Sequence, residues 1–180
     1  MNNKLHKTAF LTTLKEHDLS VYFHRNDHYI LIKGGDSSRI VSVKLICSTK
    51  IDQAIHGSHN GNEIESIGHF KFTIPKWEDH FNFYVFAFVN ATKTDSEFVI
   101  VSDEVLRSRL TKLNRIPANG KKAELTLWLM PDQCVYDCTN ISVEGEWYYL
   151  SKGVGGRMTD GTEWDYSEFL SNWDSIKYKL

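Results

Sequence analysis

The order of secondary-structure signals along this 180-residue chain predicts an α/β domain of the mixed α+β type, in which helices flank a central mixed β-sheet. Amphipathic helical patterns occupy the beginning, the middle and the end of the sequence, and short β-branched or aromatic runs lie between them. The strongest run, Phe81 to Val89, is almost continuously apolar, which is typical of a central strand covered on both faces. With 41% hydrophobic and 24% charged residues, residues 1–180 have the size and composition of one folded domain.

Spacing and cap chemistry predict the individual elements. The amphipathic pattern over residues 4–17 predicts the first helix. Ser102 and the two acids after it precede an apolar pattern, so a second helix is predicted over 103–114. The stripe of Phe169, Leu170, Trp173 and Ile176 predicts a closing helix within 165–178. Strands are predicted at 19–24, 28–33, 39–47, 67–74, 81–89, 98–101, 125–130 and 141–149.

The hairpin formed by the second and third of these strands carries the candidate site. Its turn, Gly34-Gly35-Asp36-Ser37, has residues that tolerate positive φ and favour a tight reversal. If the turn spans those four residues, Asp27 stands directly opposite Lys44, with Cβ atoms about 5 Å apart. Alternation then places Ser42 on the same face as Lys44, and Val41, Val43 and Leu45 on the other.

Charge and cysteine content restrict the class of protein. The net charge of −2 and the pI of about 6.4 exclude a globally basic nucleic-acid binder but leave room for a local basic face. Three cysteines without a disulfide pattern indicate a reducing compartment. The sequence shows neither a signal peptide nor an apolar run of about 20 residues, so we expect a cytoplasmic protein that makes no membrane contact.

The order of motifs resembles the restriction-endonuclease-like superfamily, which carries the PD-(D/E)XK motif. Asp27 and the hairpin lead to Val41-Ser42-Val43-Lys44, and the aromatic strand is followed by Glu97-Phe98-Val99-Ile100-Val101-Ser102. The chain ends on Tyr166-Ser167-Glu168-Phe169-Leu170-Ser171-Asn172-Trp173-Asp174-Ser175-Ile176. Small bacterial nuclease-fold domains typically read Asp, a hairpin, Val-Gln-Val-Lys, an aromatic strand, and a closing Tyr…Asn-Trp-Asp-Leu-Ile.

The resemblance implies catalytic roles for three residues. Asp27 matches the aspartate that binds Mg²⁺, and Lys44 matches the lysine that orients water or stabilises charge at the phosphate. Ser42 stands where the family carries Glu or Gln, and a neutral hydroxyl is a poorer ligand for a hard cation than a carboxylate. The motif is therefore degenerate at one of its metal-binding positions.

Three functions are compatible with these residues. The leading hypothesis is a nuclease-fold protein that acts on DNA by Mg²⁺-dependent phosphodiester hydrolysis, in restriction or phage-related biology. The second is a catalytically inactive member of the same fold that binds nucleic acid or a protein partner. The third is an interaction or assembly protein with no nucleic-acid role, in which Asp27 and Lys44 form an ordinary cross-strand ion pair. A protein partner or a homodimer is possible.

Several other features of the sequence have both a functional and a purely structural interpretation. Six cations without an intervening acid form a candidate phosphate-binding segment, whose plainer reading is a solvated helix face: Arg107, Arg109, Lys112, Arg115, Lys121 and Lys122. His56 and His59 are candidate metal ligands in a polar loop, and Cys134 and Cys138 lack a second pair for zinc. The glycines of 153–157 read as a turn, and the late aromatic residues as packing for the closing helix.

Overall fold

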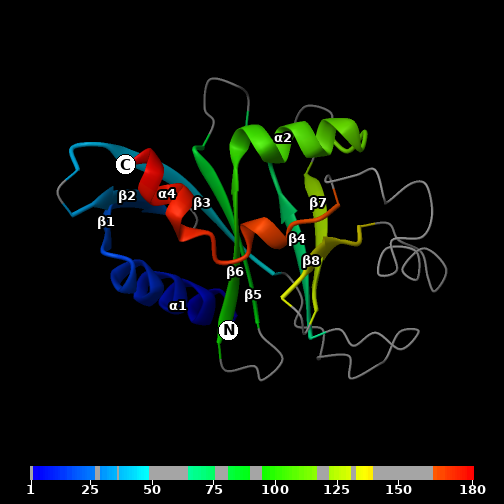
Figure 1. The fold of residues 1–180 in the computed structure, drawn as a ribbon, viewed down its shortest axis with the longest axis horizontal. Coiled ribbons are helices and arrows are strands. Elements are labelled where there is room, and N and C mark those ends of the chain that lie inside the picture. The colour runs from blue at the N-terminus through cyan, green and yellow to red at the C-terminus, as the bar shows by residue number, and fades with distance from the viewer. Residues whose placement is uncertain are drawn as a thin grey trace.

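The computed structural model shows two β-sheets that face each other, with helices on both sides of the larger sheet (Figure 1). The mixed α+β class predicted from the sequence is confirmed. The structure describes residues 2–26, 29–35, 37–48, 65–75, 81–89, 95–116, 122–130, 133–139 and 164–180. The predicted strand at 141–149, the His56 and His59 loop and the glycines of 153–157 lie outside the described residues.

The larger sheet has five strands in the order β1-β2-β3-β5-β6. β3 and β5 run parallel, and the other neighbours are antiparallel, so the sheet is mixed as predicted. The strands are β1 (Leu19–Asn26), β2 (Tyr29–Gly34), β3 (Ile40–Cys47), β5 (Phe83–Val89) and β6 (Ser96–Ser102).

The smaller sheet corrects the expectation of one sheet flanked by helices. Its three antiparallel strands are β4 (Ser66–Phe72), β7 (Ala123–Leu129) and β8 (Val135–Asp137), in the order β4-β7-β8. Burial alternates along β7, because one face of this sheet packs on the larger sheet while the other is more exposed. β8 is too short to give a periodic signal, and its sequence did not predict it.

Two hydrophobic cores lie on opposite faces of the larger sheet. One core joins α1 (Asn2–Glu16) and α4 (Trp173–Lys179) to the sheet, and the other joins α2 (Asp103–Lys112) and the smaller sheet to it. Alternate residues of β5 enter the two cores, and the described side chains of this strand are buried. The prediction of a central strand covered on both faces is confirmed.

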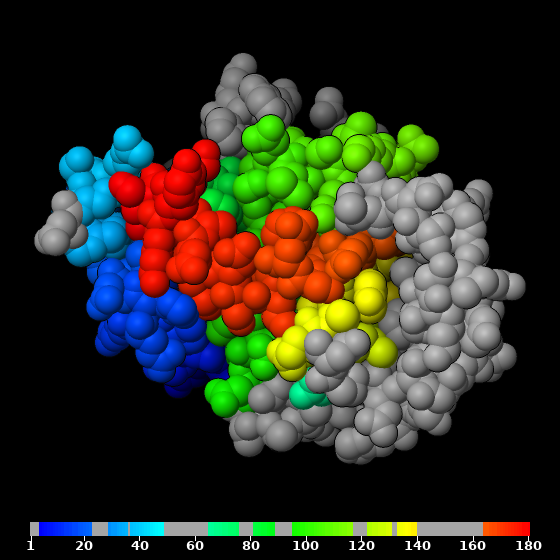
Figure 2. Space-filling view, viewed as in Figure 1, coloured from blue at the N-terminus to red at the C-terminus, as the bar shows by residue number. Residues whose placement is uncertain are grey.

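The closing segment is not the single helix predicted over 165–178. A 3₁₀ turn, η2 (Ser167–Phe169), is followed by extended Leu170, and α4 begins only at Trp173. Leu170 forms a bridge with Val99 at the edge of β6, and the Ser171 backbone N–H donates to the Phe98 carbonyl at 2.7 Å. Figure 2 shows this segment as a continuous band across the surface.

Because the closing segment is extended between η2 and α4, it packs against both hydrophobic cores. Phe169 and Leu170 pack against the core beneath α2, whereas Trp173 and Ile176 belong to the core beneath α1. The four residues share one helical stripe in the sequence, but the edge of β6 provides backbone partners that a continuous helix could not use.

Candidate functional site on strand β3

The register of the β2–β3 hairpin differs from the predicted one. Tyr29, not Asp27, lies opposite Lys44, and Lys33 pairs with Ile40. Residues 34–39 connect the two paired segments, so the connection is two residues longer than the predicted four-residue turn. Two contacts involve residues of this connection. The Arg39 N–H donates to the Ser37 hydroxyl at 3.0 Å, and that hydroxyl donates to the Leu180 carbonyl. Asp27 lies outside the described residues.

The faces of β3 are as predicted, because a shift of two residues preserves the side to which each side chain points. Val41, Val43 and Leu45 are buried in the core beneath α1 and α4. Ser42 and Lys44 lie on the opposite face and are partly exposed. The strand therefore brings a hydroxyl and an ammonium group to one side of the sheet.

Ser42 is held by Asn82, the residue just before β5. The Ser42 backbone N–H and hydroxyl donate to Asn82 Oδ1 at 2.8 and 3.0 Å. In return, the Asn82 N–H lies 3.0 Å from the Ser42 hydroxyl oxygen and 2.9 Å from the Ser42 carbonyl. Two contacts of the Ser42 hydroxyl and two of its backbone thus hold Ser42 at the point where the parallel pairing of β3 and β5 begins.

Lys44 is held by the segment that follows β4. Its Nζ donates to the Thr73 carbonyl at 2.9 Å and to the Thr73 hydroxyl at 3.1 Å, and it lies 5.4 Å from the centre of the Phe81 ring. The Phe81 ring also contacts Tyr29, with 5.3 Å between the ring centroids. Burial lowers the pKa of the Lys44 ammonium.

Asp103 is the acid that connects to this group of residues. Its backbone N–H donates to the Asn82 carbonyl at 3.1 Å, and its carboxylate accepts from Arg107 Nε at 2.7 Å. Arg107 also donates to the Pro75 carbonyl at 2.9 Å. Burial, followed by the neighbouring Asp103 carboxylate, raises the pKa of Tyr84, which stands beside Lys44 in the sheet.

Sequence reasoning missed Asn82 as a partner and treated Asp103 only as an acid at a helix start. Asn82 has one visible signal, since it is a polar residue within the aromatic run. Nothing local connects it with Ser42, which lies 40 positions earlier in the chain.

The arginines of the predicted basic segment contact other parts of the protein. Arg109 is 6% exposed, and its guanidinium carbon lies 4.6 and 4.7 Å from the ring centres of Tyr166 and Phe169. It also donates to the Asp165 carbonyl and to Glu168 at 3.1 Å. Lys112 and Lys122 are exposed, and Lys121 lies outside the described residues.

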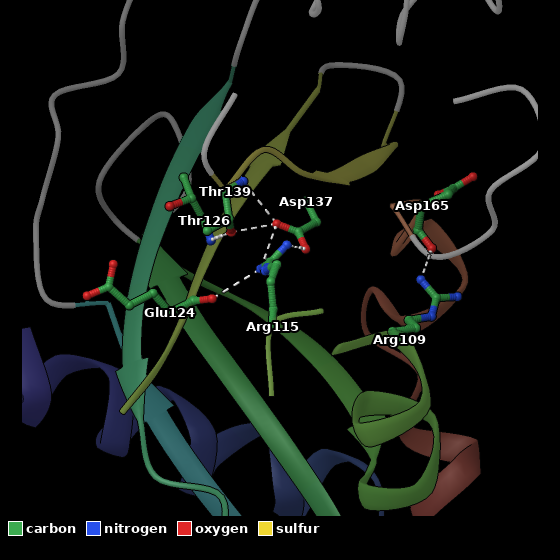
Figure 3. A network of polar contacts seen from close by, with 7 residues as sticks. All are labelled: Arg109, Arg115, Glu124, Thr126, Asp137, Thr139 and Asp165. Atoms are coloured by element: carbon green, nitrogen blue, oxygen red, sulfur yellow. Dashed lines mark hydrogen bonds and ion pairs between the residues drawn. The ribbon is translucent and has the colours of Figure 1, made fainter. Parts of the chain in front are cut away.

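Arg115 forms an ion pair with Asp137, the last residue of β8 in the smaller sheet (Figure 3). Its Nη1 donates to Asp137 Oδ2 at 2.6 Å, and its Nη2 donates to the Glu124 carbonyl at 3.1 Å. Asp137 is fully buried and also accepts from the N–H and hydroxyl of Thr139 at 3.0 and 2.6 Å. Burial raises the pKa of Asp137, while Arg115 and then Thr139 oppose that rise.

The residues described at β3 do not fit Mg²⁺. This ion prefers oxygen ligands, usually including a carboxylate, whereas the two side chains present are an amide-bound hydroxyl and an ammonium group. Within the described parts of the chain, no group of three or more His, Cys, Asp or Glu residues is placed to hold a metal ion. The same parts contain no helix that is long and apolar enough to cross a membrane.

The chain has no significant match among protein-family models, curated proteins or solved structures. The restriction-endonuclease-like resemblance therefore rests on the sequence motifs. The contacts of Ser42, Lys44 and the arginines are the structural basis for choosing among the three functions.

Proposed function

We propose that the protein is a restriction-endonuclease-like domain that binds DNA without cleaving it. The observation that favours binding over cleavage is the pairing of Ser42 with Asn82. At the position where the motif requires a metal-binding side chain, the hydroxyl is already fixed to an amide, at 3.0 Å from its oxygen. Lys44 is likewise fixed to Thr73, so both motif positions act within the protein's own hydrogen-bond network.

Asp103 does not compensate for the missing carboxylate. Its side chain is 6% exposed, and one of its oxygens accepts from Arg107 at 2.7 Å. The arginine neutralises the charge that would attract a divalent cation. Metal-dependent hydrolysis by Asp27, Ser42 and Lys44 with Mg²⁺ remains the rival proposal, and it depends on Asp27, which lies outside the described residues.

DNA is favoured as the ligand by the motif resemblance and by two cations at the hairpin, of which Lys33 is half-buried and Arg39 is exposed. Lys33 and Arg39 form no ion pair with a carboxylate in the described part of the chain, and Arg39 is exposed. Cations of this kind bind phosphate without requiring a metal.

The test uses the full chain with plasmid and with a labelled linear duplex. We expect no nicking with Mg²⁺ or Mn²⁺, and binding that weakens as salt is added, because phosphate contacts release counterions. Cleavage that disappears in Asp27→Ala would establish the nuclease instead. Failure to bind DNA at low salt, together with no cleavage, would overturn both and favour an assembly protein.

A further inference from the structure

The described residues cover one face of the larger sheet over only part of its width. On the face opposite α1 and α4, the smaller sheet and α2 bury the side chains of β5 and β6. In Figure 1 these covering elements lie at the opposite end of the larger sheet from β1 and β2. The same face of β2 and of residues 40–44 of β3 stays partly exposed. We call it the open β2–β3 face, and it comprises Tyr29, Leu31, Lys33, Ile40, Ser42 and Lys44.

The open β2–β3 face combines apolar and cationic side chains. Lys33 lies opposite Ile40, which is 43% exposed, and Leu31 lies opposite Ser42. Arg39 directly precedes Ile40 and is exposed at the end of the hairpin. The described residues of this face include no acidic side chain, although the whole chain has a net charge of −2.

The cations here differ from those of the segment after residue 106. Arg109 and Arg115 are directed into the protein, where Arg109 lies between two rings and Arg115 pairs with buried Asp137. Lys33 and Arg39 have no such carboxylate partner in the described chain. The positive charge that remains available to a ligand therefore includes the end of the β2–β3 hairpin.

We propose that the open β2–β3 face is the surface that holds DNA, with Lys33 and Arg39 contacting backbone phosphates. This inference rests on the DNA-binding function proposed above and adds the location of the contact. A guanidinium and an ammonium group bind phosphate oxygens through charge-assisted hydrogen bonds. Lys44, whose Nζ is 2.9 Å from the Thr73 carbonyl, marks the boundary of the surface.

The test compares Lys33→Gln/Arg39→Gln with a control of equal charge change, Lys4→Gln/Lys15→Gln. Lys4 and Lys15 are exposed on α1, which covers the other face of the sheet. Fluorescence anisotropy with a labelled duplex is measured from about 50 to 200 mM salt. We expect the hairpin variant to lose at least about tenfold in affinity, and its slope of log K against log salt to fall by about 2, since each lost phosphate contact removes about 0.9.

The outcomes separate the location from the function. If the wild-type protein does not bind DNA, the proposed function fails. If it binds and the hairpin variant binds equally well, or the α1 control weakens binding as much, the location is wrong while the function stands. Weakening by Lys112→Gln/Lys122→Gln in place of the hairpin variant would assign the contact to the basic segment. A concentration-dependent mass that the hairpin variant abolishes would make a second copy the occupant and overturn the proposal.

Discussion

Arg115 donates to Asp137 at 2.6 Å, and the carboxylate that it contacts is fully buried. The pair joins the end of the α2 region to β8, which is the shortest strand of the smaller sheet. Asp137 also holds Thr139, whose hydroxyl oxygen accepts from the Thr126 N–H at 2.7 Å. A cation from the predicted phosphate-binding segment therefore stabilises the second sheet.

Arg115→Met should lower the free energy of unfolding by about 3–5 kcal/mol, because it leaves a buried charge without its partner. Urea denaturation measures the loss. Arg115→Met/Asp137→Asn should recover part of it, since asparagine removes the charge and keeps an acceptor for Thr139. Lys71→Met, which breaks an exposed ion pair with Glu124, should change stability little. An equally small effect of Arg115→Met would contradict the assigned role.

The loss in Arg115→Met should also depend on pH. Burial raises the pKa of Asp137, so the folded protein holds this proton more readily than the unfolded chain does. The cost of the buried charge is therefore absent at low pH and appears as the pH rises through the folded pKa. The difference in unfolding free energy between Arg115→Met and wild type should therefore shrink as the pH falls toward 3.8, the usual pKa of an aspartate.

The sequence predicts what repeats locally and misses what depends on distant partners. Alternation placed Val41 and Val43 in the core, and the apolar run correctly indicated that β5 is covered on both faces. The hairpin register was missed because a shift of two residues leaves every side chain on the same face. Turn chemistry indicated the reversal but not the length of the connection.

The site shows the same limit. The alternation of residues predicts Ser42 and Lys44 on one face of the strand, and the structure places them there. Their partners, Asn82 and Thr73, are 40 and 29 positions away, and no local pattern connects them. The roles of Arg109 and Arg115 were missed because their partners are distant in the sequence. Arg109 contacts the closing segment and Arg115 contacts β8, whereas the local run of cations is typical of an exposed face.

Arg109→Lys should lower stability by about 2 kcal/mol without weakening DNA binding by the folded protein. A lysine loses the stacking between Tyr166 and Phe169, and it cannot reach the Asp165 carbonyl and Glu168 together as the planar guanidinium does. Thermal and urea unfolding measure the first effect, and anisotropy with duplex measures the second. Glu168→Gln is the control, because the Glu168 side chain is 68% exposed. Weaker DNA binding at unchanged stability would show instead that Arg109 contacts phosphate.

Asn82→Ala and Asn82→Asp should behave differently. Alanine removes the oxygen that accepts from the Ser42 N–H and hydroxyl, at a cost of about 1 kcal/mol in unfolding free energy. Aspartate keeps an acceptor at the same position, so it should retain most of that stability. Urea denaturation of both variants distinguishes the contact from a general intolerance of substitution. Equal losses in the two would mean that the Asn82 oxygen does not hold Ser42.

His6 should make the protein less stable in mild acid. The side chain is fully buried on α1, its Nδ1 lies 2.8 Å from the Ser96 hydroxyl, and burial lowers its pKa. Below the usual value of 6.5 the unfolded chain takes up a proton that the folded protein resists, so stability falls as the pH drops through that region.

His6→Gln isolates this effect, because glutamine keeps polar atoms and does not titrate. Glu97, whose pKa is raised by burial and then by Glu65 and Asp95, titrates in both proteins, so its contribution largely cancels in the difference. Urea denaturation at pH values above and below 6.5 should show that wild type loses stability relative to His6→Gln as the pH falls. A difference that stays constant across this range would show that the folded protein accepts the His6 proton as readily as the unfolded chain.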